Sequence, residues 1–171
     1  MAVLEIGFGN GRLLPSLMQR ADRLNYVGFD VSPTMVEEAQ RFNAPLIAAG
    51  QAAFHLADAE RLPATDASFD RVFAVNVIYF WADPPRQLAE IRRVLKPDGF
   101  CVVAASAPEI TALMPMLRPE FGFHARDEET LVAMHEAAGF GRVGVEVFTE
   151  FVPRPEGDAA PVKVYIIVAR P

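Results

Sequence analysis

The sequence predicts an α/β fold built on a doubly wound, mostly parallel sheet. Apolar runs that are typical of buried strands alternate with runs of helical periodicity from residue 2 to about residue 105. Residues 3–6 run into closely spaced glycines, and residues 25–30 end in Asp30. Ligands of doubly wound sheets bind in the crevice beyond the carboxyl ends of the strands. The sequence therefore also predicts where a site would lie.

The glycines form a corner between the first predicted strand and a helix expected from residue 13 to residue 21. Gly7, Gly9 and Gly11 would permit positive φ and let a ligand approach the backbone. The helix would direct free N–H groups toward the same space, although Pro15 predicts that it begins late or kinks. The spacing is GxGxG, whereas dinucleotide dehydrogenases carry GxGxxG. A tight turn without a ligand also collects glycine, so the corner by itself leaves both interpretations open.

Asp30 favours the ligand-binding interpretation. It stands nineteen residues after Gly11, at the end of the second predicted strand. A carboxylate at that place can accept hydrogen bonds from both ribose hydroxyls of an adenosine. Together, the glycine corner and the acid predict a site for an adenosine-containing ligand.

Six blocks of the sequence resemble, in the same order, those of class I S-adenosylmethionine-dependent methyltransferases of the small-molecule, type 11-like kind. The blocks are VLEIGFGNG from residue 3, NYVGFD from residue 25, SPTM from residue 32, FHLADAERLP from residue 54, SFDRVFAVN from residue 68 and LKPDGF from residue 95. They cover residues 2 to about 105, and the resemblance rests on all of them together.

The resemblance implies a Rossmann-like sheet of seven strands in the order 3-2-1-4-5-7-6, with the last strand antiparallel, in a single domain over residues 1–171. It also implies S-adenosylmethionine as the cofactor. The residues that it assigns to cofactor binding are Glu5, Gly7, Gly9, Gly11, Asp30, Val31, Met35, Asp58, Ala59 and Asn76.

Roles for these residues follow from the same resemblance. The glycines would let the backbone approach the methionine half of the cofactor and its ribose. Glu5 would help to hold the cofactor's ammonium group, often through water. Asp58 would accept from the exocyclic amine of the adenine, with the Ala59 backbone beside the ring. Met35 would pack on the adenine or belong to the core, and Asn76 could contact the methionine part.

The segment after the fourth predicted strand is where the resemblance places the methyl group. Adenine-N6 and glutamine methyltransferases read Asn-Pro-Pro-Tyr there, but this chain reads NVIYFW from residue 76. Val77 and Ile78 replace both prolines, so the sequence does not support chemistry on a planar amide or amine. Tyr79 and Trp81 are expected, with Phe80, to line an apolar substrate chamber; the alternative is that they pack beneath the next helix.

His124 is the candidate for a general base on the substrate side. A base is needed only if the acceptor must lose a proton, because alignment with an already reactive sulfonium can suffice. A lone loop histidine is more often simply solvated, and His55 and His135 fit a strand and a helix as structural residues. The sequence therefore identifies no catalytic residue.

Composition excludes several other classes of function. The net charge of −6 and pI of about 5.1 leave no basic excess for a nucleic-acid backbone. The single cysteine, Cys101, excludes an internal disulfide and a multi-cysteine zinc site, and no metal is expected. No apolar run approaches the roughly 18 residues of a membrane span, and no signal segment opens the chain. We expect a cytoplasmic protein.

The other elements are predicted from periodicity and capping residues. One helix is expected from Pro33, after the cap Ser32, with a further turn at 46–50. A second is expected from Pro84, after the cap Asp83, to the Pro97-Asp98-Gly99 segment. A third is expected over 128–138, after the cap Asp127. Strands are expected over 52–57, 71–75, 100–105, 143–152 and 162–169. The segment 107–126 is rich in Pro and Met and shows no single period, so it is expected to form an irregular cover.

The predicted function is methyl transfer from S-adenosylmethionine to a small or lipophilic molecule, which the sequence does not name. Two alternatives stay open: a non-catalytic cofactor-binding paralogue or truncated methyltransferase, and a nicotinamide-dependent oxidoreductase. Members of the family usually carry helices upstream of the first strand, which this chain is expected to lack. The cover would then come from the segment 107–126 or from a partner, for example in a homo-oligomer.

Overall fold

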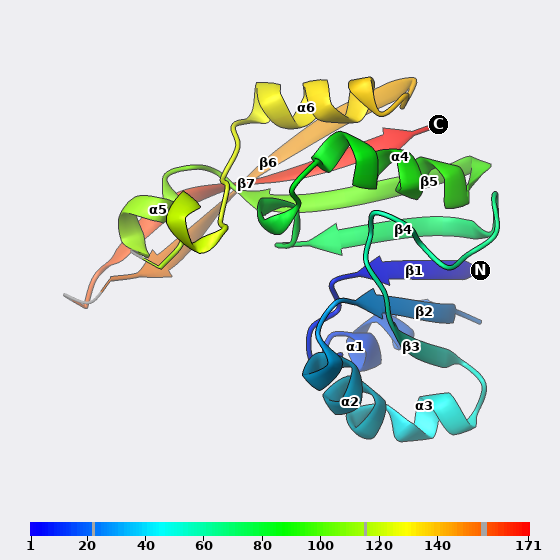
Figure 1. Cartoon of the computed structure of the whole chain (residues 1–171). Helices are drawn as coiled ribbons and strands as arrows, with labels where there is room; N and C mark the ends of the chain where they lie inside the picture. Colours follow the sequence, from blue (N-terminus) through cyan, green and yellow to red (C-terminus); the bar gives the residue numbers. More distant parts are fainter. Residues whose placement is uncertain (22, 115, 155–156) are drawn as a thin grey trace.

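A seven-stranded sheet forms the centre of the molecule (Figure 1). The computed structural model describes residues 1–21, 23–114, 116–154 and 157–171. The strand order is β3-β2-β1-β4-β5-β7-β6, which confirms the predicted order. Strands β1 to β5 are parallel, whereas β7 is antiparallel to both β5 and β6. The strands are β1 (Ala2–Ile6), β2 (Asn25–Asp30), β3 (Ala52–Leu56), β4 (Phe69–Val75), β5 (Leu95–Ser106), β6 (Arg142–Pro153) and β7 (Ala159–Arg170).

Helices lie on both faces of this sheet. Figure 1 shows α1 (Leu14–Met18), α2 (Pro33–Phe42) and α3 (Ala44–Ala48) beside β1, β2 and β3, and α4 (Pro84–Val94) and α6 (Glu128–Ala137) over the other half. Alternate residues of β1 enter two separate cores, Leu4 and Ile6 on the α4 side and Val3 on the α2 side. The central strands are thus buried on both faces, as their continuous apolar sequences predict. Within the described residues, none of the helices combines the length and apolarity needed to cross a membrane.

Capping residues set the starts of α2 and α6 as the sequence predicts. The Ser32 Oγ accepts from the Met35 N–H at 3.4 Å, and an Asp127 carboxylate oxygen accepts from the Thr130 N–H at 2.9 Å. Asp83 occupies the cap position of α4, but its side chain makes no capping hydrogen bond. Only the position of that third cap is therefore confirmed.

The helix after the glycine corner is shorter than predicted. Instead of running from residue 13 to 21, α1 comprises five residues with Pro15 in its first turn. The chain between the glycines and α1 turns on itself, because the Gly11 N–H donates to the Phe8 carbonyl and the Leu14 N–H donates to the Gly11 carbonyl. The first N–H groups are therefore used in turns, and the expected helix terminus facing a ligand does not form.

The junction between α4 and β5 also differs from the prediction. The helix ends at Val94, and the Pro97-Asp98-Gly99 segment lies inside the long strand β5 instead of closing the helix. The pairing with β4 shifts there, from Phe69 opposite Leu95 to Arg71 opposite Phe100. A side chain at Gly99 would come within 2.9 Å of the Asp70 carbonyl oxygen, so this bulge requires glycine.

The segment 107–126 contains regular turns that the sequence did not predict. A short helix, α5 (Ile110–Leu113), and a 3-10 turn, η2 (Pro119–Phe121), form within it. Ile110 and Phe123 are buried in the core on the α4 side of the sheet, the main core, which anchors the segment at two points.

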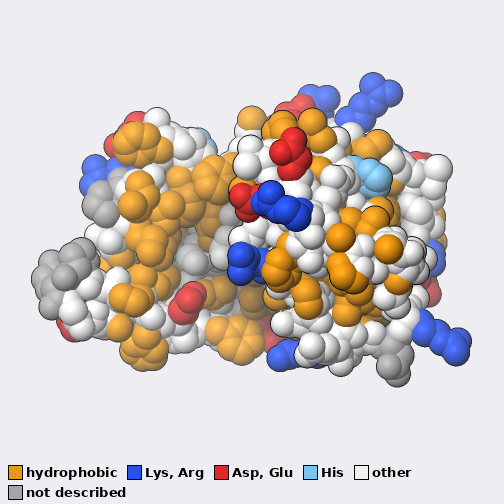
Figure 2. Space-filling view, turned by 90° about the horizontal axis from the view of Figure 1, so that it is seen from below, with side chains coloured by type: hydrophobic (Ala, Val, Ile, Leu, Met, Phe, Trp, Pro, Cys, Tyr) orange, Lys and Arg blue, Asp and Glu red, His pale blue; other side chains and the backbone are white. Residues whose placement is uncertain are grey.

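Part of the sheet face on the side of α1, α2 and α3 carries partly exposed apolar side chains. Among the described residues no helix lies over β5 and β7 on that side (Figure 1). Figure 2 shows hydrophobic side chains gathered at the surface of the molecule seen from below. The register places Phe73, Val102 and Val168 next to one another on this face, and all three are only partly buried. This exposed face lies away from the carboxyl edge where the candidate site forms.

Candidate functional site

A cavity of about 560 Å³ opens at the carboxyl ends of β1, β2 and β3 and beside the segment that follows β4. We call it the main cavity. Seven of the predicted site residues line it: Gly7, Gly9, Asp30, Val31, Asp58, Ala59 and Trp81. Six do not: Glu5, Gly11, Met35, Asn76, Tyr79 and His124. The volume lies within the range of small-molecule and cofactor sites.

The three glycines of the corner have different surroundings, although all have positive φ. A Cβ at Gly7 would collide with the Val77 side chain, and a Cβ at Gly11 would come within 2.8 Å of both Ala39 and Asn43. Apart from its two chain neighbours, none of the described residues has an atom within 4 Å of the place that a Cβ at Gly9 would take. Only Gly9 therefore offers open space in which a ligand could approach the backbone; the other two allow close packing.

We expect Gly11→Ala to destabilise the protein more than Gly9→Ala. Both substitutions place a side chain in the left-handed region, at a cost of about 1–2 kcal/mol. Only Gly11→Ala adds a steric conflict with α2, and overpacking typically costs a further ~1–3 kcal/mol. Urea unfolding of the two variants measures the difference. Equal losses of stability would contradict the different surroundings of the two glycines.

Asp30 connects the glycine corner to the start of α2. One carboxylate oxygen accepts from the Gly9 N–H at 3.0 Å, and the other accepts from the Ser32 N–H at 2.9 Å. A carboxylate has about four acceptor positions, so further hydrogen bonds to a ligand can still form. The partly buried side chain lines the cavity and is held in place before any ligand binds.

Glu5 lies beneath the corner rather than at the cavity surface. Its side chain is 5% exposed and accepts a hydrogen bond from the Tyr26 hydroxyl at 2.6 Å. Burial raises the pKa of Glu5 to about 7; the Tyr26 hydrogen bond opposes this shift, and the charge of Asp30 adds to it. The carboxyl group therefore changes its protonation state near neutral pH.

Asp58 and Ala59 line the cavity just beyond the end of β3, the strand next to β2. An Asp58 carboxylate oxygen accepts from the Glu60 N–H at 2.9 Å, which fixes the turn after β3. The Ala59 side chain is buried against the main core. The sequence did not single out Glu60, which also lines the cavity.

Asn76 and Tyr79 belong to the segment after β4 but do not line the cavity. Asn76 has a φ of 58°, which is unusual for a residue other than glycine, and its side-chain oxygen accepts from the Tyr79 hydroxyl at 3.1 Å. The Tyr79 hydroxyl oxygen also accepts from the Ser106 N–H. The Tyr79 ring stacks on Phe123 at 4.1 Å between centroids. Tyr79 thus packs internally, as the alternative interpretation of the aromatic segment allowed, while Phe80 and Trp81 line the cavity.

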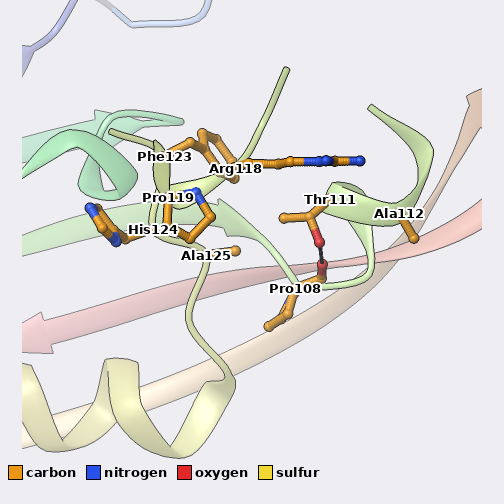
Figure 3. Close-up of a pocket in the computed structure, with 8 residues that line it drawn as sticks. All are labelled: Pro108, Thr111, Ala112, Arg118, Pro119, Phe123, His124 and Ala125. Atoms are coloured by element: carbon orange, nitrogen blue, oxygen red, sulfur yellow. Dashed lines mark hydrogen bonds between the residues drawn. The ribbon is translucent and has the colours of Figure 1, made fainter. Parts of the chain in front are cut away.

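His124 lies at a second cavity of about 440 Å³, which Figure 3 shows. The His124 ring and the Arg118 side chain extend in opposite directions from this segment (Figure 3). Phe123 lines this second cavity and Phe80 lines the first, with ring centroids 5.6 Å apart. The two cavities are therefore neighbours, and the aromatic pair lies between them.

The residues that sequence reasoning did not assign to the site but that line this cavity include Val77, which packs on Gly7, and Gln87 of α4. A signal for Gln87 was present in the sequence, since a polar residue stands on the helix face that also carries Leu88, Ile91 and Val94.

The cavity lacks the groups used in several other kinds of catalysis. Among the described residues, no three His, Cys, Asp or Glu side chains lie close enough together to hold a metal ion. Cys101 is buried in β5, and desolvation raises the pKa of its thiol to about 12, so it is not an activated nucleophile. The arrangement can bind and align a ligand, and the described residues that line it include no Ser, Thr, Cys, Lys or His that could form a nucleophile–base pair.

Comparisons with known proteins agree with this architecture. A family model described as a methyltransferase domain matches residues 4–103. The O-methyltransferase resE of Aspergillus sclerotiorum is 34% identical over 104 residues, which cover 60% of this chain and 38% of that protein. The demethylmenaquinone methyltransferase of Deinococcus radiodurans is 36% identical over 112 residues, which cover 65% of this chain and 45% of that protein. The chain thus spans less than half the length of these two relatives.

The fold comparison extends over nearly the whole chain. The crystal structure of the YcgJ protein from Bacillus subtilis superposes with a TM-score of 0.75, covering 99% of this chain and 91% of that one at 19% sequence identity. At this identity the likeness shows the fold alone. The family model covers more than half of the chain, from β1 into β5, and includes the glycine corner, Asp30 and Asp58. The chain therefore belongs to the methyltransferase domain family.

Proposed function

We propose that the chain binds S-adenosylmethionine in the main cavity and transfers its methyl group to a small or lipophilic acceptor. The observation that carries this proposal is the charge of the cavity. Its charged lining residues are Asp30, Asp58 and Glu60, and no Lys or Arg stands among the described residues that line it. Acidic walls favour a ligand with a sulfonium and an ammonium group, and they disfavour the pyrophosphate of a nicotinamide dinucleotide.

The residues present fit this cofactor. Asp30 would accept from the ribose hydroxyls with its remaining acceptor positions, and Gly9 leaves open space for close approach to the backbone. Asp58 and Ala59 would contact the adenine beyond the end of β3. Glu5 lies behind the corner, so it would act on the ammonium group without direct contact. It would stabilise this group electrostatically, because its carboxyl group can ionise near neutral pH.

The bound cofactor would supply an already activated methyl group, and the chain would supply alignment and exclusion of water. Alignment of this kind can lower a barrier by up to ~7–11 kcal/mol. Phe80 and Trp81 form an apolar wall next to the segment where the methyl group is expected. His124 lies at the neighbouring cavity, so it would act as a base only on an acceptor that reaches past the aromatic pair Phe80 and Phe123.

The apolar wall also supports the proposed acceptor class. Phe80 is 59% exposed beside the cavity, so its ring is accessible to an apolar ligand. One of the relatives is named for methylation of demethylmenaquinone, a lipophilic quinone, and another as an O-methyltransferase. We infer that a small hydroquinone or phenol is a suitable first acceptor to test.

A direct test is calorimetric titration with S-adenosylhomocysteine and, separately, with NADH, followed by turnover assays with short-chain hydroquinones. The proposal predicts binding of S-adenosylhomocysteine, no binding of NADH, and methylated product. Binding without turnover of any acceptor would favour the non-catalytic alternative. Binding of NADH alone would overturn the proposal in favour of an oxidoreductase.

A further inference from the structure

Gln87 has a buried amide oxygen without a hydrogen-bond donor. The residue is 3% exposed, and among the described residues no group donates to its Oε1. It lies in the first turn of α4, where the Gln87 N–H donates to the Asp83 carbonyl at 3.3 Å. The next residue on the helix, Leu88, is fully buried. The backbone that carries the amide is therefore fixed, and a buried acceptor without a partner is costly in a folded protein.

The same amide lines the main cavity. Gln87 is one of its lining residues. The start of α4 lies against the turn after β3, because the guanidinium of Arg86 is 3.4 Å from the carboxylate of Glu60, which also lines the cavity. The last torsion of a glutamine side chain is broad, so the amide can turn its oxygen or its nitrogen toward a ligand at little cost. An apolar residue would fill this position of α4 without an unsatisfied group. A ligand that donates a hydrogen bond to the amide oxygen would satisfy this acceptor, whereas packing inside the protein does not.

We propose that the Gln87 carboxamide binds the adenine of the cofactor, with its oxygen accepting from the exocyclic amine. This inference rests on the proposed function, which places the adenine at the Asp58 end of the cavity. An exocyclic amine carries two hydrogens, so it can donate to Asp58 and to Gln87 at the same time. A glutamine amide can also form two hydrogen bonds with adenine at once. Its oxygen accepts from the exocyclic amine, N6, and its NH₂ group donates to the ring nitrogen N7.

Such a contact makes Gln87 a specificity residue. A site that hydrogen-bonds a ligand group discriminates strongly against an analogue without that group, because the buried protein atoms are then left unpaired. The discriminating analogue is S-inosylhomocysteine, in which a carbonyl oxygen replaces the adenine amine. On the edge of the ring that carries N7, this analogue presents two acceptors, O6 and N7, so neither orientation of the Gln87 amide satisfies both atoms.

The test compares Gln87→Leu with wild type and with the control Gln51→Leu, which changes an exposed glutamine next to β3. Calorimetry with S-adenosylhomocysteine and S-inosylhomocysteine gives the preference for the amine. We expect Gln87→Leu to lower the affinity for S-adenosylhomocysteine about tenfold, to leave that for the inosine analogue within about twofold, and to unfold at the same or a higher temperature without ligand. The control should match wild type in all three measurements.

Three results would overturn the inference. Unchanged affinity for S-adenosylhomocysteine in Gln87→Leu would mean that the amide does not touch the ligand. Equal losses for both ligands would mean that Gln87 shapes the wall without reading the amine. If wild type binds neither ligand, the proposed function fails together with this inference. Gln87→Met, with a side chain of similar length, gives the same comparison should the leucine variant not fold.

Discussion

Asp30→Ala is expected to weaken the binding of S-adenosylhomocysteine by roughly one to two decades. Hydrogen bonds to a charged group contribute about 1.5–3 kcal/mol, and a tenfold change in affinity corresponds to about 1.4 kcal/mol. The loss has two sources, the ribose contacts and the corner itself, because the substitution also removes the acceptor of the Gly9 and Ser32 N–H groups. Calorimetry on the folded variant measures the total effect.

A second substitution separates these two sources. Asp30→Asn keeps one side-chain oxygen for either the corner or the ligand, so we expect an intermediate affinity. Asp98→Ala is the matched control, since Asp98 is an exposed acid in β5 that does not line the cavity. Wild-type affinity in a folded Asp30→Ala protein would remove Asp30 from the cofactor site.

Glu5→Gln is expected to flatten the dependence of stability on pH. Burial raises the pKa of Glu5 in the folded protein from 4.5 to about 7, so between these values the folded state holds a proton that the unfolded state has released. Stability must therefore fall as the pH rises through this window, and the loss is complete above pH 7. At about 1.4 kcal/mol for each pKa unit, the change amounts to roughly 3 kcal/mol.

The measurement is urea unfolding of wild type and Glu5→Gln at several pH values between 4 and 8. The variant keeps an acceptor for the Tyr26 hydroxyl but has no proton to lose, so its advantage over wild type should grow with pH. Glu37→Gln serves as the control, because Glu37 is an exposed acid on α2. Parallel pH profiles for wild type and Glu5→Gln would show that Glu5 ionises in the folded protein as it does in the unfolded chain.

The features that sequence reasoning predicted well depend on local chemistry. Ser32 and Asp127 cap helices because their side chains reach N–H groups three residues away, a relation visible in the sequence. Asp30 and Asp58 come to the same edge because each follows a parallel strand, and parallel strands end at the same side of the sheet. The complete strand order came from the resemblance to a family, since periodicity does not specify which strands are neighbours.

The errors concern places where interactions other than the apolar period decide where an element begins or ends. The helix after the glycines was predicted to reach residue 21 from its apolar period, but turns at Gly11 and the proline in its first turn limit it to five residues. The Pro97-Asp98-Gly99 segment was expected to close a helix, yet pairing with β4 draws it into β5. In both cases contacts beyond the local period decided the outcome.

The sequence by itself determined the fold class, the edge of the sheet that carries the site, and the residues Gly9, Asp30 and Asp58 that line the cavity there. Only the tertiary structure decided that Val77 occupies the space beside Gly7 and that α2 occupies the space beside Gly11. It also decided that Glu5 lies behind the corner and that an amide from α4 reaches the cavity wall. The physical reason is that strand ends and caps follow from neighbouring residues, whereas open space, burial and unpaired hydrogen-bonding groups exist only once distant segments have packed together.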